Sequence, residues 1–361
     1  MFCHKKVILC LIQKLKIVDM GFGRIFGRRI FAASLALTKE IFCLKAANDQ
    51  GGKNRLSDYE GYMVLLLSLA LTACTEMQFA ESPHPYDPQL PDYQDINVAF
   101  VLGGGGAKGI AHVGVMEELI KQGITPDLIV GCSAGAIVGA LYADSMDMDQ
   151  VKQLILPQMR DNLVNLSLNF LPFGISDGYG LQSFLKSNLK AQHFEELKIP
   201  FVAVATNLQF GDMTAFGKGE LIPAVRASAA FPGIFTPVPI QGQFFVDGGV
   251  ANNVPAEVAR RMGAKFIIVI ELDAGLPETG PTNAFGILRR CLQISLRHQS
   301  RLALAGADYV IKIALPDVGT FDDGLNEVVY QRGREVGQHE GMKIRHVLNQ
   351  KIRKTRQSMR N

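Results

Sequence analysis

From Ile96 onward the sequence alternates short apolar runs with longer helix-like runs, and this alternation restricts the chain to few folds. The runs "INVAFVLG", "DLIVG", "PFVAVATN", "GQFFVDG", "AKFIIVIEL" and "DYVIKIAL" have the length and composition of buried strands. Helical spacing follows the first two, and further helices are expected at 284–304 and from about 325 to the late 340s. Strands separated by helices indicate a three-layer α/β fold with a mainly parallel central sheet flanked by helices.

We assign residues 95–348 to one such domain, because no internal repeat or linker divides them. The stretch 146–195 is irregular and apolar, as in "LSLNFLPFGIS". We expect it to form a cap or lid and not an element of the sheet.

The charge balance narrows the classes of partner. Residues 1–62 hold eleven Lys and Arg against five Asp and Glu, which leaves 26 against 29 from Met63 onward. This excludes a globally basic, nucleic-acid-binding protein. The tail at 349–361 is basic and has no acidic residue. It is either a solvated helix end or a segment attracted to anionic lipid headgroups.

The front of the chain has the pattern of an export signal. Residues 63–73 are mostly apolar but too short to span a bilayer, which takes about 20 residues. They match the apolar core of a secretory signal, and 71–74 resemble a bacterial lipobox that ends at Cys74. Residues 75–94 are polar and Pro-rich, as expected of a tether. Residues 1–62 show no coherent domain pattern, and we expect the true start near Met63 or shortly before it.

These features predict a lipid-anchored protein of the bacterial cell envelope, at the outer membrane or facing the periplasm. If the signal is not used, the protein is cytoplasmic. Metabolic labelling with palmitate, with Cys74→Ala as the control, distinguishes the two. The other five cysteines form no CxxC pair, and the histidines supply no zinc spacing, so we expect no metal site.

The first motif that carries chemistry is "GGGGAKG" at 103–109, where a strand leads through glycines into a helix. Backbone N–H groups at such a place form a nest for a phosphate or a transient oxyanion. Gly104, Gly106 and Gly109 also fit a dinucleotide fingerprint. That alternative needs an acidic residue at the end of the second strand, and Asp127 begins this strand instead.

The second motif is "GCSAG" at 131–135, which has the form of a nucleophile elbow around Ser133. The small residues Gly131 and Gly135 permit a crowded turn, and the helix that follows would place the hydroxyl at its positive end. The alternative is an ordinary strand-to-helix turn with Ser133 as the N-cap.

The third motif is Asp247-Gly248-Gly249 at the end of a strand, and alone it is simply a turn. Together, and in this order, the three motifs and the "ASAAFPGIF" block between the last two resemble the patatin-like phospholipase family over about 250 residues. The motifs most resemble those of the bacterial branch of this family that is related to neuropathy target esterase. The lipobox is not part of this family pattern.

The resemblance implies a serine acyl hydrolase with a Ser-Asp dyad and no cofactor. Ser133 matches the nucleophile and Asp247 the residue that activates it. Gly104, Gly105 and Gly106 match the oxyanion hole, and Lys108 stands where many members carry Arg or Lys. Gly109, Gly131, Gly135, Gly248 and Gly249 match supporting positions. The implied substrate is a phospholipid or lysophospholipid.

Of the seven histidines, His298, His339 and His346 follow Asp247 in the chain and could complete a Ser-Asp-His series. None of these three lies in a loop with a functional signature, so a triad is the weaker interpretation. His112 follows the glycine loop on a helix, where we expect a satisfied packing residue. Two other functions stay open besides acyl hydrolysis. One is a non-catalytic lipid-binding envelope protein, and the other is a dinucleotide-binding enzyme.

Overall fold

The computed structural model describes residues 77, 79, 82, 84–157, 173–273, 275, 280–315, 318 and 324–358. The chain divides into two compact units, Met1–Met77 and Gln78–Asn361, and every element below belongs to the second. The predicted signal, the lipobox with Cys74 and part of the predicted cap (158–172) lie outside the described residues. Among the described helices none is both long and apolar enough to cross a membrane.

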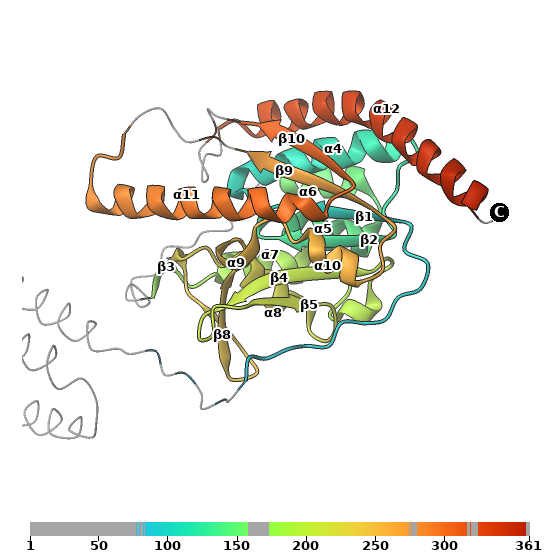
Figure 1. The fold of residues 1–361 in the computed structure, drawn as a ribbon. Helices are drawn as coiled ribbons and strands as arrows, with labels where there is room; N and C mark the ends of the chain where they lie inside the picture. Colours follow the sequence, from blue (N-terminus) through green and yellow to red (C-terminus); the bar gives the residue numbers. More distant parts are fainter. Residues whose placement is uncertain are drawn as a thin grey trace, which may run out of the picture. The chain divides into compact units, whose positions relative to one another are not determined.

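The core of the unit is an eight-stranded sheet with the order β10-β9-β1-β2-β4-β8-β7, in which β5 also pairs with β4 (Figure 1). The pairs from β10 to β4 are parallel, whereas β8, β7 and β5 join antiparallel. β3 and β6 form a separate pair. The strands are β1 (Val98–Leu102), β2 (Leu128–Cys132), β3 (Gly174–Ser176), β4 (Phe201–Asn207), β5 (Met213–Phe216), β6 (Gly233–Phe235), β7 (Val238–Ile240), β8 (Gln243–Asp247), β9 (Phe266–Asp273) and β10 (Tyr309–Ala314).

Helices cover both faces of this sheet (Figure 1). They are η2 (Gly106–Gly109), α4 (Ile110–Lys121), α5 (Ala134–Ser145), α6 (Met148–Ile155), α7 (Tyr179–Asn188), η4 (Phe194–Glu196), α8 (Leu221–Ser228), α9 (Gly249–Asn252), α10 (Ala256–Arg261), α11 (Ala284–Ala303), η5 (Leu304–Gly306) and α12 (Asn326–Ser358). Along β1, Phe100 and Leu102 join the apolar core shared with α4, α5 and α12, while Ala99 and Val101 join the core shared with α10. The predicted three-layer α/β fold is therefore confirmed.

Three segments differ from the sequence-based expectation. The predicted irregular cap contains two regular helices, α6 and α7, because each hides an apolar face that short windows do not reveal. The last helix, α12, extends to Ser358 and so includes most of the segment assigned to a basic tail. The short strands β5, β6 and β7 were not predicted, since three or four residues carry too little periodicity.

Helices α4 and α12 lie against each other at unusually short range, and glycines make this possible. A methyl group on Gly333 would overlap the carbonyl oxygen of Ala111, and one on Gly114 would overlap that of Tyr330. The Arg334 side chain donates to Glu118 Oε1 at 2.6 and 2.8 Å across the same interface. The two helices therefore meet backbone to backbone over the core.

Gly333→Ala is expected to lower the unfolding free energy by about 1–3 kcal/mol, because α12 must move away from α4. The matched control is Gly341→Ala on the same helix. The nearest atoms to a methyl group there belong to the flexible Gln122 side chain, which donates long hydrogen bonds to the Gly337 and Gln338 carbonyls. The control should lose less unfolding free energy than Gly333→Ala, since alanine favours a helix by about 1 kcal/mol over glycine and this offsets the loss of those bonds. Urea unfolding of both proteins measures the difference, and equal midpoints would contradict the close packing.

Candidate active site

Two strands that run in opposite directions meet end to end beside β4, and the meeting point is the site. β2 pairs with one edge of β4 as far as Cys132, which lies opposite Val204. β8 pairs with the next residues of β4 and ends at Asp247, opposite Ala205. Because β5 occupies the other edge of the same β4 residues, β2 and β8 share one edge. Their carboxyl ends therefore abut, which brings residues 114 positions apart side by side.

Ser133 lies on a sharp turn between β2 and α5. Its backbone angles are φ 54° and ψ −123°, a region that costs strain for a residue with a side chain. The strained turn lifts the hydroxyl out of the sheet and places it at the N-terminus of α5, where the helix dipole is positive. Ser133 accordingly stays partly exposed, while its neighbours Cys132 and Ala134 are buried.

The Asp247 carboxylate accepts a hydrogen bond directly from the Ser133 hydroxyl. Ser133 Oγ donates to Asp247 Oδ2 at 2.6 Å, and the Gly249 amide donates to the other carboxylate oxygen at 2.8 Å. The carboxylate is only 4% exposed, and burial raises the pKa of Asp247 to about 6, although both hydrogen bonds act to lower it. A carboxylate with this pKa is a stronger base than an exposed one and is still ionised at neutral pH.

A second serine, Ser228, ties the junction together. Its Oγ accepts from the Ser133 amide at 3.0 Å and donates to the Val204 carbonyl at 2.6 Å. Its own carbonyl accepts from the Gly248 amide at 3.2 Å. Sequence reasoning placed Ser228 in the "ASAAFPGIF" block without a role, although that block was the available signal. The structure gives it contacts with the middle of β4 and with the residues that follow β2 and β8.

The glycine loop runs beside the serine. A methyl group on Gly104 would come within 3.0 Å of Ser133 Cβ, so the loop passes next to the nucleophile candidate. Gly104 itself is held by Asn253: its amide donates to the Asn253 carbonyl at 3.3 Å, and Asn253 Nδ2 donates to its carbonyl at 3.3 Å. Asn253 was missed because no motif marks it.

The three predicted oxyanion-hole glycines are therefore not equivalent. The amide of Gly104 is engaged, whereas those of Gly105 and Gly106 have no hydrogen-bond partner among the described residues. Gly106 has φ +59°, the left-handed region that favours glycine. Two donors with unused capacity at the start of η2 and α4 are what an anion would need.

The supporting glycines are required by close approach. A methyl group on Gly135 would overlap the Leu102 carbonyl, and one on Gly248 would overlap the Val204 carbonyl. Gly109, Gly131 and Gly249 are crowded by Ala134, Ala136 and the Asn253 side chain in the same way. Lys108 is buried within η2, and its amide donates to the Gly105 carbonyl at 3.3 Å. These residues shape the loop and the elbow without touching the reacting hydroxyl.

His112 supports the loop and is not a base. Its Nε2 lies 2.7 Å from the Gly103 carbonyl oxygen, so this nitrogen carries the proton. Burial lowers the pKa of His112 to about 4, which keeps the ring neutral. The expectation of a fully satisfied residue holds for one nitrogen only, since Nδ1 is buried with no partner in the described part of the chain. Within the same part of the chain no histidine bonds to Ser133 or Asp247.

Two neighbouring groups do not compete in this chemistry. Burial and the charge of Asp247 raise the pKa of the Cys132 thiol well above its ordinary value, so it stays protonated. Asp127 accepts from the amides of Asn97 and Val98 at 2.9 Å each, at the start of β1. Asp127 therefore lies at the opposite end of β1 from the glycine loop. It is not placed to bind the ribose of a dinucleotide held by that loop. The described residues hold no cluster of three or more acidic, His or Cys side chains suited to a metal.

Part of the chain is similar to known proteins. Residues 100–260 match the family model described as "Patatin-like phospholipase". Patatin-like phospholipase domain-containing protein 7 of Rattus norvegicus is 36% identical over 193 residues, which is 52% of this chain and 14% of that protein. Lysophospholipase NTE1 of Cryptococcus neoformans is 33% identical over 190 residues, which is 51% of this chain and 12% of that protein. The chain thus matches only about a seventh of the length of these relatives.

Among solved structures, VipD from Legionella pneumophila aligns with a TM-score of 0.43 and 16% identity. The alignment covers 78% of this chain and 72% of that one. A likeness at this level carries no argument about activity.

Proposed function

We propose that the chain is a serine acyl hydrolase acting on lipid acyl esters, because residues 100–260 match the model of the patatin-like phospholipase family and relatives named for this domain are similar to about half of the chain. The observation that carries the proposal is the 2.6 Å hydrogen bond from Ser133 Oγ to the buried Asp247 carboxylate. The substrate class, a phospholipid or lysophospholipid, is part of the proposal, because the relatives match over a small share of their length.

In the proposed first step Ser133 Oγ attacks the ester carbonyl carbon while Asp247 Oδ2 takes its proton. The negative charge that develops on the carbonyl oxygen is held by the amides of Gly105 and Gly106. The intermediate then collapses, the bond to the alcohol oxygen breaks, and the alcohol takes the proton from Asp247. This leaves the acyl group on Ser133 and restores the carboxylate.

In the second step water gives a proton to Asp247 while its oxygen attacks the acyl carbon of the acyl-enzyme. The bond from the acyl carbon to Ser133 Oγ then breaks, Oγ takes the proton back from Asp247, and the fatty acid is released. Ser228 acts in both steps as a positioning residue, since it fixes the strained backbone of Ser133 through its amide. It also engages that amide, so the Ser133 amide is not among the proposed oxyanion donors.

Two other functions are disfavoured by specific observations. A dinucleotide-binding enzyme would need an acidic side chain beside the glycine loop, and Asp127 is bonded at the far edge of the sheet. A non-catalytic lipid-binding protein would have no use for a strained serine bonded to a carboxylate of raised pKa. Labelling with a serine-directed fluorophosphonate probe separates this second function from acyl hydrolysis.

The activity should depend on pH with a midpoint near 6. Only the ionised form of Asp247 can accept the proton, and burial raises its pKa to about 6. The value of kcat/KM is therefore expected to be constant above this pH and to fall about tenfold per unit below it. An uncharged short-chain ester avoids titration of the substrate. A midpoint near the ordinary aspartate pKa would contradict the assignment.

Mass spectrometry of the products from a defined lipid panel tests the reaction itself. The wild-type protein should release fatty acid from one class, and Ser133→Ala should release none above the uncatalysed rate. Phospholipids and lysophospholipids with distinct chains at the two glycerol positions reveal the class and the position cleaved. Release of fatty acid at equal rates by both proteins would overturn the proposed function.

A further inference from the structure

Helix α11 presents large apolar side chains to solvent. Ile287 is 53% exposed, Leu288 69%, Ile294 48% and Leu302 69%, and the thiol of Cys291 is exposed between them. The positions 287, 291, 294 and 302 fall on one side of the helix by its 3.6-residue period. Scattered exposed apolar residues are ordinary on protein surfaces, but a stripe along one helix marks an interaction site.

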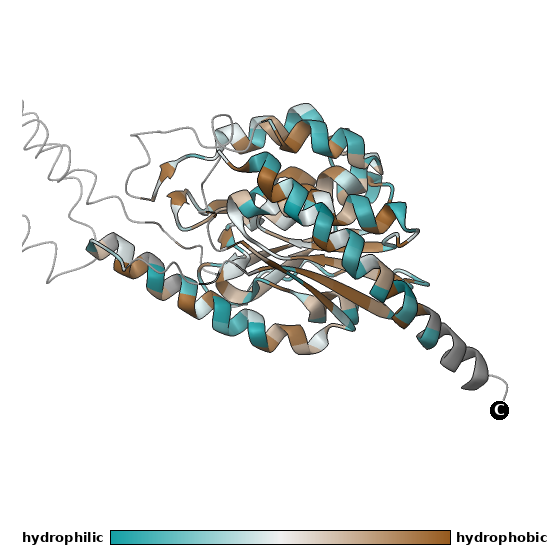
Figure 2. Cartoon of the chain, turned by 90° about the horizontal axis from the view of Figure 1, so that it is seen from above, coloured by the Kyte–Doolittle hydropathy of each residue, from teal (hydrophilic) through white to brown (hydrophobic). Residues whose placement is uncertain are grey.

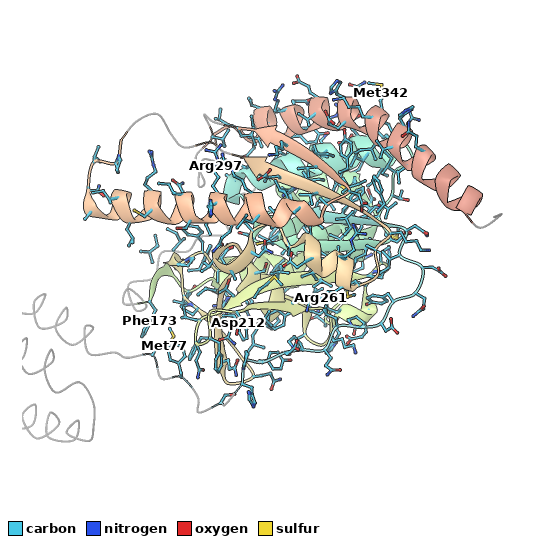
Figure 3. All side chains as sticks on the ribbon, in the orientation of Figure 1. Met77, Phe173, Asp212, Arg261, Arg297 and Met342 are labelled. Carbon is cyan, nitrogen blue, oxygen red and sulfur yellow. The ribbon has the colours of Figure 1, made fainter. Side chains whose placement is uncertain are left out.

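The side that faces the protein is mixed. Ser300 is buried, Gln293, Leu296 and Arg297 are half-buried, and Ala303 packs against the apolar core. A helix that simply covers a sheet turns its large apolar side chains inward. Packing against this domain therefore does not explain the large apolar residues that α11 exposes. Figure 2 shows hydrophobic segments along α11, and Figure 3 labels Arg297 on the same helix.

All the charged residues of α11 are cationic. Its 20 residues include four arginines, at 289, 290, 297 and 301, and no aspartate or glutamate. An apolar stripe with arginines and no acidic residue is the composition of helices that lie in the interface of an anionic membrane. Apolar side chains enter the acyl boundary, and the arginines attract the headgroups. A second copy of α11 would be repelled by the same charges.

The position of α11 relates it to the candidate site. It connects the parallel strands β9 and β10. It therefore begins on the side of the sheet where the carboxyl ends of these strands and of β2 lie, which is called the carboxyl edge below. Ser133 lies at the carboxyl edge. The C-terminal half of α11 packs against α9, which starts at Gly249, two residues after Asp247. Figures 1 and 2 both show the first half of α11 extending beyond the sheet.

We propose that α11 is an interfacial docking helix, which seats the enzyme on an anionic phospholipid surface with Ser133 toward the lipid. The inference rests on the proposed function for the fate of the bound lipid, but the docking is a separate property. It also does not depend on an anchor at Cys74. The helix concentrates the enzyme at an aggregated substrate, whereas a dissolved ester reaches the site without it.

Binding is measured with the full chain carrying Ser133→Ala, so that the vesicles stay intact, and with vesicles of phosphatidylcholine with and without phosphatidylglycerol. Leu288→Glu should weaken binding to the anionic vesicles at least about tenfold, because it removes buried apolar area and adds a repelled charge. Arg301→Gln should weaken it about fivefold and leave binding to phosphatidylcholine alone nearly unchanged.

The matched control is Val328→Glu, since Val328 is 61% exposed on α12, which packs with α4 on the other face of the sheet. It should bind as the parent does. All variants with Ser133 restored should hydrolyse a dissolved short-chain ester at the parent rate. If the protein binds vesicles but cleaves no ester, the proposed function is wrong and the docking proposal stands.

Three results would overturn the docking. They are unchanged binding by Leu288→Glu, an equal loss in Val328→Glu, and binding that does not depend on phosphatidylglycerol. A protein that forms dimers in solution, and loses them with Leu288→Glu, would assign the stripe to a second copy and overturn it as well.

Discussion

Ser133→Ala is expected to slow acyl-ester hydrolysis on the order of 10⁴-fold or more, because it removes the atom that the proposed mechanism uses to form the acyl-enzyme. The loss should appear in kcat and in kcat/KM together, since Ser133 Oγ bonds to Asp247 and not to substrate before reaction. Any residual rate comes from substrate held by the remaining groups and attacked by water. The measurement is hydrolysis of a dissolved short-chain ester at pH 8.

The control for this substitution is Ser145→Ala at the other end of α5. Its hydroxyl donates to the Leu141 carbonyl at 2.8 Å and lies away from the elbow. This variant should keep its activity within about twofold. A fluorophosphonate probe should label the wild type and Ser145→Ala but not Ser133→Ala. Persistent labelling of folded Ser133→Ala would show that another nucleophile is present.

The sequence predicted the sheet well because its central strands are buried on both faces. Runs such as "AKFIIVIEL" are continuous and apolar, and this pattern is typical of parallel strands that are covered on both faces. The antiparallel strands β5 and β7 have no comparable pattern, since they are short and lie toward one end of the sheet. What the sequence could not predict is that β8 reverses direction and meets β2 end to end.

The residues of the candidate site likewise divide into those that the sequence could predict and those that it could not. Ser133, Asp247 and the glycine loop lie in motifs, because a strained turn, a buried carboxylate and a close backbone contact each need a particular residue type. Ser228 and Asn253 act through hydrogen bonds of kinds that many polar residues and backbone groups make. Their roles depend on long-range packing. In α11 the periodicity predicts an amphipathic helix, but only the structure shows which side is exposed.

The meeting of β2 and β8 also explains how two residues can replace three. In a triad, an imidazole spans the distance between serine and carboxylate. Here the register of β4 brings the two chain ends together, so the carboxylate reaches the hydroxyl at 2.6 Å without an intermediary. The cost is a weaker base, and burial offsets it in part by raising the pKa of Asp247 to about 6.

Asp247→Asn is expected to slow acylation of Ser133 by about 10²- to 10⁴-fold, because an amide cannot accept the hydroxyl proton. The side chain keeps its shape, and its oxygen can still accept from the Gly249 amide, so the loss belongs to the base. The rate of fluorophosphonate labelling measures acylation directly. Labelling at the wild-type rate would mean that another group takes the proton.

Asp247→Asn should not lower the unfolding free energy. A loss of activity in this variant can therefore be assigned to the missing base and not to unfolding. The pKa of Asp247 is raised from 3.8 to about 6 on folding, so the folded protein holds this proton more tightly than the unfolded chain. Ionisation therefore opposes folding, fully above about pH 6 and progressively less down to about pH 4. Asparagine lacks this penalty. Asp247→Asn should thus gain unfolding free energy relative to wild type between pH 4 and pH 6 and keep the gain at pH 8, and a pH-independent difference would contradict the raised pKa.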